Sequence, residues 1–325
     1  MIKVGIIGGS GYTAGELLRL LINHPDVTLR WVHSNTRPGE RIDAIHKGLV
    51  GELGDMTFTG DIDLEGLDVL FLCTRHGHSQ PFLETHTIPE GLRLIDLSRD
   101  YRMASEDNEF VYGLPELNRR IMVHDCLRVA CPGSIATGIA LGLLPLARNL
   151  LIGSDLHITS VLGSTGLGAA YRDYRDDYSS SNSNVVVYKP FDEGHVAEVR
   201  QTLTALQQSF DSTINLVPIR GSFARGLLTT IHLRCNVDID LLKQLYRDYY
   251  DDHNFTFIVD SQPDLKDVVN TNKCLIHLER IGERLLITTA IDNLLKGASG
   301  TAVHVMNLMC GLHERVGLQL KASAF

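Results

Sequence analysis

The segment that most constrains the fold of this chain is a glycine turn directly after its first apolar run. Residues 2–7 suit a buried strand, residues 8–15 are rich in glycine, and residues 16–22 have the spacing of an amphipathic helix. A strand, a glycine turn and a helix in this order are typical of a nucleotide-binding α/β unit. The chain is therefore expected to begin with such a unit.

The same turn is a candidate dinucleotide site. The spacing Gly8-x-x-Gly11-x-x-Ala14 lets the backbone approach a pyrophosphate, whose charge the N-terminus of the next helix stabilises. A tight turn that binds no ligand is the alternative. The predicted cofactor-binding residues of the turn are Gly8, Ser10, Gly11, Tyr12 and Thr13.

The end of the second expected strand, residues 27–32, indicates which dinucleotide binds. NAD enzymes usually place an acidic residue near this point to hold the ribose 2′-hydroxyl, whereas this chain has hydroxyls and a cation between His33 and Arg37. Hydroxyls and a cation suit a 2′-phosphate. Ser34 and Arg37 therefore favour NADP, and a solvated loop with one surface arginine is the alternative.

Two later strand ends carry further polar residues. His76 and His78 follow the strand expected at 68–73, and we interpret them as lining of a cofactor cleft, because no third metal-ligand cluster accompanies them. Arg102 follows the strand expected at 92–97 and suits a phosphate or a carboxylate, although a salt bridge to a neighbouring aspartate is the alternative.

The reaction centre is expected where the strand at 126–130 ends in Cys131-Pro132-Gly133 and a helix begins at Ser134. Unpaired N–H groups and the macrodipole at a helix start stabilise negative charge, so a nucleophile there ionises more easily. A turn with a serine cap is the alternative.

Composition excludes some partners. The net charge of −9 disfavours nucleic acid and anionic membranes, so a small anionic substrate would need local arginines. The six cysteines form no CxxC pair and several lie in apolar runs, which indicates reduced core residues and a cytosolic protein. Neither a signal peptide nor an apolar run of membrane-spanning length is visible, so no export or membrane insertion is expected.

The second half of the chain has a different pattern, which predicts a largely antiparallel or mixed sheet. A polar, serine-rich loop is expected over 171–184, and the last helix, over 298–313, is expected to pack on the first domain. Helices are expected over 193–209 and 239–250. The expected strands are 157–162, 185–188, 213–219, 227–237, 256–259, 274–281 and 285–291.

Several blocks together resemble the N-acetyl-gamma-glutamyl-phosphate reductases of arginine biosynthesis, relatives of aspartate-semialdehyde dehydrogenase. These blocks are residues 8–16, 96–102, 112–118, 163–168, 225–228 and 292–300. The resemblance implies an α/β protein with an NADP-binding Rossmann domain, a doubly wound parallel sheet, over 1–133 and 297–325. It further implies a glyceraldehyde-phosphate-dehydrogenase-like catalytic domain over 134–296, and a homo-oligomer, a tetramer or a dimer.

The resemblance also implies a mechanism in which a cysteine attacks an acyl phosphate and NADPH reduces the resulting thioester to an aldehyde. His195 matches the family's catalytic histidine, although the second histidine usual just before it is missing. Arg102, Arg220 and Arg225 are candidates to hold the substrate's phosphate or carboxylate, and Asn293 is expected at the cofactor.

The chain departs from the family at the nucleophile. The family reads Asn-Pro-Gly-Cys, and this chain has Cys131 and Ser134 at the first and last of these positions. An engineered change, a natural paralogue with altered activity, and a nucleophilic Cys131 are the competing explanations. We favour a divergent natural sequence, because an engineered change at 134 would not explain Cys131. A nucleophilic Cys131 is disfavoured, since an extended link separates residues 131 and 134 by up to about 10 Å.

Three functions follow from these observations. The first is an NADPH-dependent acylglutamyl-phosphate reductase, with Ser134 or Cys131 as nucleophile and His195 as acid and base. The second is an NADP-binding paralogue without catalysis, acting as a sensor or binding protein. The third, a serine hydrolase using Ser134, is disfavoured because the surrounding residues do not match G-x-S-x-G.

Overall fold

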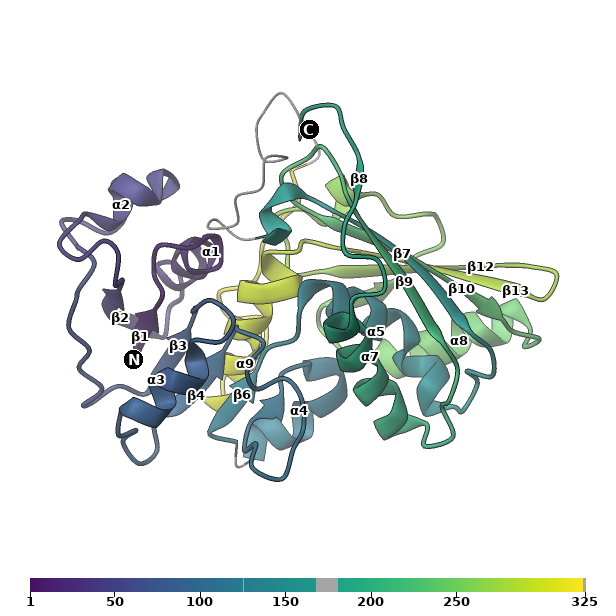
Figure 1. The fold of residues 1–325 in the computed structure, drawn as a ribbon, viewed down its shortest axis with the longest axis horizontal. Helices are drawn as coiled ribbons and strands as arrows, with labels where there is room; N and C mark the ends of the chain where they lie inside the picture. Colours follow the sequence, from purple (N-terminus) through teal and green to yellow (C-terminus); the bar gives the residue numbers. More distant parts are fainter. Residues whose placement is uncertain (125, 168–180, 324–325) are drawn as a thin grey trace. The chain divides into compact units, whose positions relative to one another are not determined.

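The computed structural model describes residues 1–124, 126–167 and 181–323. The chain divides into two compact units (Figure 1). The first unit is Met1–Pro132 with Ala298–Gln319, and the second is Gly133–Gly297 with Leu320–Phe325. The domain boundaries expected from the sequence, at 134 and 296, differ from these by one residue each, but residues from 320 onward group with the second unit.

Within its described residues, the first unit is a six-stranded parallel sheet in the order β2-β1-β3-β4-β6-β5. The strands are β1 (Ile2–Ile7), β2 (Val27–His33), β3 (Val69–Leu72), β4 (Arg93–Asp96), β5 (Val111–Tyr112) and β6 (Arg128–Ala130). The chain runs from β1 to β2 on one side and then to β3 on the other, so the strand order reverses at β1. Ligands bind at the carboxyl ends of strands at such a switch point.

Helices cover this sheet. They are α1 (Tyr12–Leu21), α2 (Ile42–Ile45), α3 (Ser79–Thr85), α4 (Pro115–His124) and α9 (Gly300–Met309), with a 3₁₀ turn η1 (Lys47–Leu49). Helix α9 contacts both α1 and α4, as expected for a last helix that packs on the first domain. Because β3 and the middle of β4, Leu94 and Ile95, are apolar and buried, as in a sheet covered on both faces, this is a doubly wound α/β unit, and the predicted fold class is confirmed.

Helix α1 begins four residues earlier than the sequence predicted. Gly15, which we assigned to the turn, lies inside the helix, where a Cβ would come within 2.6 Å of His46 Nδ1. The His46 ring also lies with its Nε2 2.7 Å from the carbonyl oxygen of Gly9. The glycine at position 15 is therefore needed for the approach of His46, and not for a turn.

The second unit contains a seven-stranded mixed sheet in its described residues, in the order β11-β12-β13-β10-β7-β9-β8. The pairs β7–β9 and β11–β12 are parallel and the others antiparallel, so the predicted mixed sheet is confirmed. The strands are β7 (Leu156–Leu162), β8 (Val186–Val187), β9 (Ile214–Arg220), β10 (Leu227–Arg234), β11 (Thr256–Ile258), β12 (Cys274–Ile281) and β13 (Arg284–Ile291).

The helices of this unit are α5 (Ser134–Arg148), α7 (Glu193–Leu206) and α8 (Ile239–Tyr250), with short turns η2 (Ser164–Leu167) and η4 (Leu265–Asp267) and a π-helical turn η5 (Leu295–Ser299) that leads into α9. Most of the predicted polar loop at 171–184 lies outside the described residues. No helix in the described part of the chain is both long and apolar enough to cross a membrane.

Helix α5 is almost wholly buried and packs on β10 and β13. It contains Pro145, which has no N–H to donate to the carbonyl of Leu141. The hydroxyl of Tyr250 donates to that carbonyl instead, and the hydroxyl of Tyr246 donates to the next one, that of Gly142, at 2.6 Å. Helix α8 therefore supplies the hydrogen bond that the proline removes.

Candidate functional site

The glycine turn between β1 and α1 has the geometry that a pyrophosphate requires. Gly8 has φ +83°, and a Cβ on it would come within 2.4 Å of the carbonyl oxygen of Cys73, at the end of β3. Gly11 is the N-cap residue of α1 in an extended conformation, and no side-chain hydrogen bond caps the helix among the described residues. The turn thus presents backbone and an uncapped helix start, and a dinucleotide fits it.

Of the two predicted NADP-selective residues, Ser34 lies beside this turn. The Ser34 Oγ is 3.5 Å from the Ser10 Oγ and 3.4 Å from the Thr36 Oγ1, so the end of β2 and the glycine turn meet through their hydroxyls. The guanidinium of Arg37 is exposed and pairs with the Glu40 carboxylate at 3.0 Å. Exposed ion pairs of this kind are weak and exchange readily for a phosphate.

Arg102 and Cys131 occupy the same region of the first unit. The Nε of Arg102 donates to the Cys131 carbonyl at 2.8 Å, and its Nη2 lies 3.3 Å from the Leu97 carbonyl. The Cys131 side chain is 1% exposed. Burial raises the pKa of the Cys131 thiol well above its usual range, and the nearby Asp96 carboxylate raises it further. Both features argue against Cys131 as a replacement for the missing nucleophile, because a buried, protonated thiol is a poor nucleophile.

Asp96 itself is buried at the end of β4. Its carboxylate accepts hydrogen bonds from the Ser79 Oγ at 2.7 Å and from the Ser98 Oγ at 2.7 Å. Burial raises its pKa, and the two serine hydroxyls oppose that shift. This network orders the carboxyl ends of β3 and β4. The His76 Nδ1 accepts from the Arg99 N–H at 3.1 Å, which places His76 at the same strand ends.

In the second unit, Ser134 is the first residue of α5 and is partly exposed. Its N-cap residue, Gly133, is extended (φ −67°, ψ 146°) and has no side chain with which to cap the helix. A Cβ on Gly297 would come within 2.6 Å of the Ser134 Cβ, so the backbone of the η5 turn presses directly on Ser134. Ser134 therefore packs against the Gly297 backbone. It also begins a helix, whose N-terminus favours negative charge.

His195 lies in the first turn of α7, which the Asp192 carboxylate caps by accepting from the N–H groups of Gly194 and His195 at 3.1 and 3.3 Å. One turn further along, the Glu198 Oε1 accepts from the Gly133 N–H at 2.8 Å. Residues three apart share a helix face. The hydrogen bond from Glu198 thus brings the turn that carries His195 to the start of α5.

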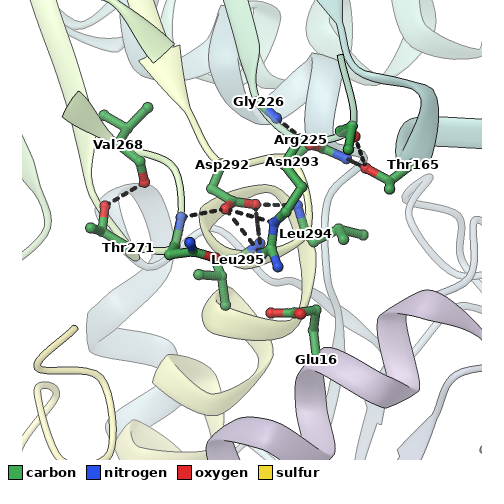
Figure 2. Close-up of polar contacts among 12 residues, drawn as sticks. Glu16, Thr165, Arg225, Gly226, Val268, Thr271, Asp292, Asn293, Leu294 and Leu295 are labelled. Carbon is green, nitrogen blue, oxygen red and sulfur yellow. Dashed lines mark hydrogen bonds and ion pairs between the residues drawn. The ribbon is translucent and has the colours of Figure 1, made fainter. Parts of the chain in front are cut away.

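One of the remaining predicted residues of this unit, Arg225, is bound to a buried carboxylate, that of Asp292 (Figure 2). The Arg225 guanidinium pairs with it at 3.0 Å, and the N–H groups of Asn270 and Leu294 donate to it at 2.7 and 2.9 Å. Arg225, which we expected to hold substrate, is instead bound to a structural carboxylate. Arg220 ends β9 and is partly exposed.

Asn293, which we expected at the cofactor, joins two loops of the second unit. Its Oδ1 accepts from the Gly226 N–H at 2.7 Å, and its Nδ2 donates to the Thr165 Oγ1 at 3.0 Å (Figure 2). Both polar ends of the side chain thus have protein partners, and the residue is 3% exposed.

Sequence reasoning missed Glu198, Asp292 and Gly297. The only signal for Glu198 was its spacing of three residues from His195 on an expected helix. Asp292 and Gly297 lie within a block that supported the family resemblance, but nothing in their local pattern indicated a contact with Arg225 or Ser134.

Comparisons with known proteins agree with this architecture. Residues 3–124 match the family model of the semialdehyde dehydrogenase NAD binding domain, and residues 135–293 match that of the semialdehyde dehydrogenase dimerisation domain. The first unit is therefore a nicotinamide-dinucleotide-binding domain. Aspartate semialdehyde dehydrogenase II from Vibrio cholerae has the same fold, with a TM-score of 0.72 at 15% identity, over 96% of this chain and 99% of that one.

Relatives with higher identity extend over the full length. The N-acetyl-gamma-glutamyl-phosphate reductase of Parabacteroides distasonis is 53% identical over 325 residues, and that of Bacteroides thetaiotaomicron is 52% identical over 325 residues; each comparison covers 100% of both chains. This identity confirms the resemblance inferred from the sequence. The chain belongs to the N-acetyl-gamma-glutamyl-phosphate reductase family, oxidoreductases of the semialdehyde dehydrogenase type.

Proposed function

We propose that this chain reduces N-acetyl-gamma-glutamyl phosphate to N-acetyl-glutamate semialdehyde and phosphate, with NADPH as the reductant, in arginine biosynthesis. The observation that carries the proposal is the hydrogen bond that links α7 to the start of α5 in the second unit. Ser134 begins α5, and Glu198 ties the His195 turn of α7 to the preceding residue. Full-length relatives named for this reaction support the substrate.

In this proposal the Ser134 hydroxyl attacks the acyl carbon, its proton passes to His195, and phosphate leaves. The acyl group is then an ester of Ser134. NADPH, when bound, supplies a hydride to that acyl carbon. His195 returns the proton to the departing serine oxygen, so that the aldehyde is released and the serine is restored.

With serine as the nucleophile, these reaction steps are slow. A serine hydroxyl ionises far less readily than a thiol near neutral pH, and an oxygen ester accepts hydride less readily than a thioester. The helix start and the proposed base, His195, partly offset the first handicap. We therefore expect a reduced rate in the chain as it stands, and a faster one when a thiol replaces the hydroxyl.

The preference for NADP over NAD is part of the proposal. The Ser34 hydroxyl beside the glycine turn and the weakly paired Arg37 guanidinium support it, because together they offer donors and a positive charge to a 2′-phosphate. Arg102 and Arg220 are the proposed substrate-binding cations. We assign Arg225 to the support of the Asp292 turn.

A homo-oligomer in the cytoplasm completes the proposal. The match of residues 135–293 to a dimerisation domain supports self-association. The six cysteines, none of them in a disulfide in the structure, support a reducing compartment.

One observation favours a second function. The family's cysteine position holds Ser134, and the only cysteine nearby in sequence, Cys131, is buried with a raised thiol pKa. An NADP-binding paralogue without catalysis, acting as a sensor or binding protein, would have these features. It would bind the cofactor and show no turnover.

The test is the reverse reaction, with N-acetyl-glutamate semialdehyde, phosphate and NADP, on the native chain and on Ser134→Cys. Phosphate-dependent NADPH formation by the native chain, lost in His195→Ala, supports the reductase, and mass spectrometry should place the acyl adduct on Ser134. Turnover only in Ser134→Cys indicates an intact scaffold whose native form is the binding protein. Absence of turnover in both chains contradicts the reductase.

A further inference from the structure

We propose that Glu198 is a positioning residue that fixes position 134 relative to His195. The inference rests on the proposed roles of those two residues. The Glu198 side chain is 3% exposed, and its Oε1 accepts the Gly133 N–H at 2.8 Å. Glu198 belongs to α7 and Gly133 immediately precedes Ser134, so one hydrogen bond joins the two helices at the place where both candidate catalytic residues lie.

The geometry makes this contact a rigid one. A hydrogen bond between a carboxylate and a peptide N–H is shorter and stronger than one between neutral groups, and burial strengthens it further. Because the N–H belongs to the N-cap residue, the bond fixes the peptide plane from which α5 starts. The side chain of residue 134 leaves the chain one residue later, so its direction is set by this plane.

His195 is held from both sides by the same arrangement. Asp192 caps α7 through the N–H groups of Gly194 and His195, and Glu198 anchors the helix one turn later. The segment 192–198 therefore cannot rotate about the α7 axis without breaking one of these contacts. We infer that the distance between the His195 ring and the side chain at position 134 depends on Glu198.

A second structural element, the η5 turn, also contacts Ser134 and is ordered by Asp292, which is paired with Arg225. The same turn contains Lys296, which is buried and has its Nζ 5.9 Å from the centre of the Phe255 ring. Glu198 and the η5 turn thus reach position 134 through different residues, Gly133 and Gly297.

The test uses the thiol introduced by Ser134→Cys as a reporter. Its rate of alkylation by iodoacetamide, measured from pH 5 to 10 with the modified peptide identified by mass spectrometry, reports how strongly His195 activates it. The native chain gives the background from its own cysteines. In the Ser134→Cys chain, His195→Ala should lower the rate at neutral pH about tenfold, and Glu198→Ala should cause a similar loss.

Two further variants separate positioning from simple structural support. Glu198→Gln keeps an acceptor for the Gly133 N–H and should restore most of the rate. Glu193→Ala removes an exposed carboxylate from the first turn of the same helix and should leave the rate unchanged. If Glu198 acts through His195, adding Glu198→Ala to the Ser134→Cys/His195→Ala chain should cause no further loss.

An unchanged alkylation rate in Glu198→Ala overturns the proposal, as does a further tenfold loss in the chain that already lacks His195. If Glu198→Ala fails to fold, Glu198→Gln decides: a full loss of rate in that folded variant also overturns it. Alkylation requires no turnover. A positive result with no reductase activity would therefore uphold Glu198 while contradicting the proposed function, and the reverse outcome is equally distinguishable.

Discussion

Two helices in this chain begin in the same way and are supported differently. Helix α1 and helix α5 both start after an extended glycine, Gly11 or Gly133, which has no side chain with which to cap the helix, and neither has an acidic residue in its first turn in the described part of the chain. At α1 the first residue, Tyr12, is 48% exposed. At α5 the N-cap N–H is bound by Glu198, and Gly297 presses on Ser134.

The difference separates two uses of a helix start. An exposed start such as that of α1 suits a large anionic ligand, whose phosphates themselves complete the hydrogen bonding. A start supported on several sides, such as that of α5, suits a single reacting atom, because chemistry requires that atom to be held within a fraction of an ångström. Single substitutions can alter each contact that supports the start of α1 or of α5.

The largest expected effect is at Asp292, which orders the turn behind Ser134. Asp292→Ala removes a buried carboxylate that pairs with the Arg225 guanidinium and accepts from the N–H groups of Asn270, Leu294 and Leu295. Loss of one partner of a buried ion pair costs about 3–5 kcal/mol, so urea unfolding should show a decrease in stability of that size. As a control, Asp55→Ala removes an exposed partner of Arg41 and should cost less than about 1 kcal/mol. Equal effects of the two changes would show that Asp292 is not a structural anchor.

At α1, the support is the backbone of the glycine turn. Gly8→Ala places a Cβ 2.4 Å from the Cys73 carbonyl oxygen at a positive φ, and should destabilise the chain by about 2–4 kcal/mol and abolish dinucleotide binding. Gly11→Ala has space for its Cβ, whose nearest neighbour would lie at 3.9 Å, and should cost less than about 1 kcal/mol. Thermal unfolding and cofactor titration measure both. A Gly8→Ala chain that binds NADPH normally would contradict the geometry assigned to the turn.

The far half of α5 is supported by the two tyrosines of α8. Tyr250→Phe leaves the Leu141 carbonyl without a donor, because Pro145 cannot provide one, and should cost about 1–3 kcal/mol. Tyr246→Phe should cost less, about 0.5–1.5 kcal/mol, since the Gly142 carbonyl still has the N–H of Leu146 as a helical partner. Chemical denaturation of the two variants compares them. The reverse order would mean that the buried carbonyl finds another donor.

The sequence predicted the start of α5 correctly and placed the start of α1 four residues too late, and it predicted only part of what surrounds either helix. Apolar runs locate the strands because burial on both faces excludes polar residues, and the Pro132-Gly133 turn marks the point at which a helix begins. The contact between Gly133 and Glu198 joins residues 65 positions apart. No local pattern encodes such a pair, since it depends on how α7 packs against α5.

The expectations that the structure argues against have the same physical origin. Cys131 appeared available because the sequence gives no measure of burial, and Arg225 appeared free because its partner, Asp292, lies 67 residues away. Gly15 was assigned to a turn from its residue type, whereas the ring of His46 explains its presence within α1. In each case a distant side chain decided the role of a residue whose own neighbourhood suggested another.

The smallest expected effect concerns cofactor selectivity at the exposed helix start. Among the residues that the structure describes, the Arg37 guanidinium is held by an exposed ion pair with Glu40, so it is available to a 2′-phosphate at little cost. Arg37→Ala should weaken NADPH binding about tenfold, as loss of a charge-assisted hydrogen bond does, and leave NADH binding unchanged. Fluorescence titration with both cofactors measures the difference, and Glu40→Gln, which frees the guanidinium, should leave NADPH affinity equal or slightly higher. An equal loss for NADH and NADPH would show that Arg37 supports the loop and not the phosphate. Selectivity would then depend on the Ser34 hydroxyl next to the glycine turn, and the exposed start of α1 would accept either dinucleotide.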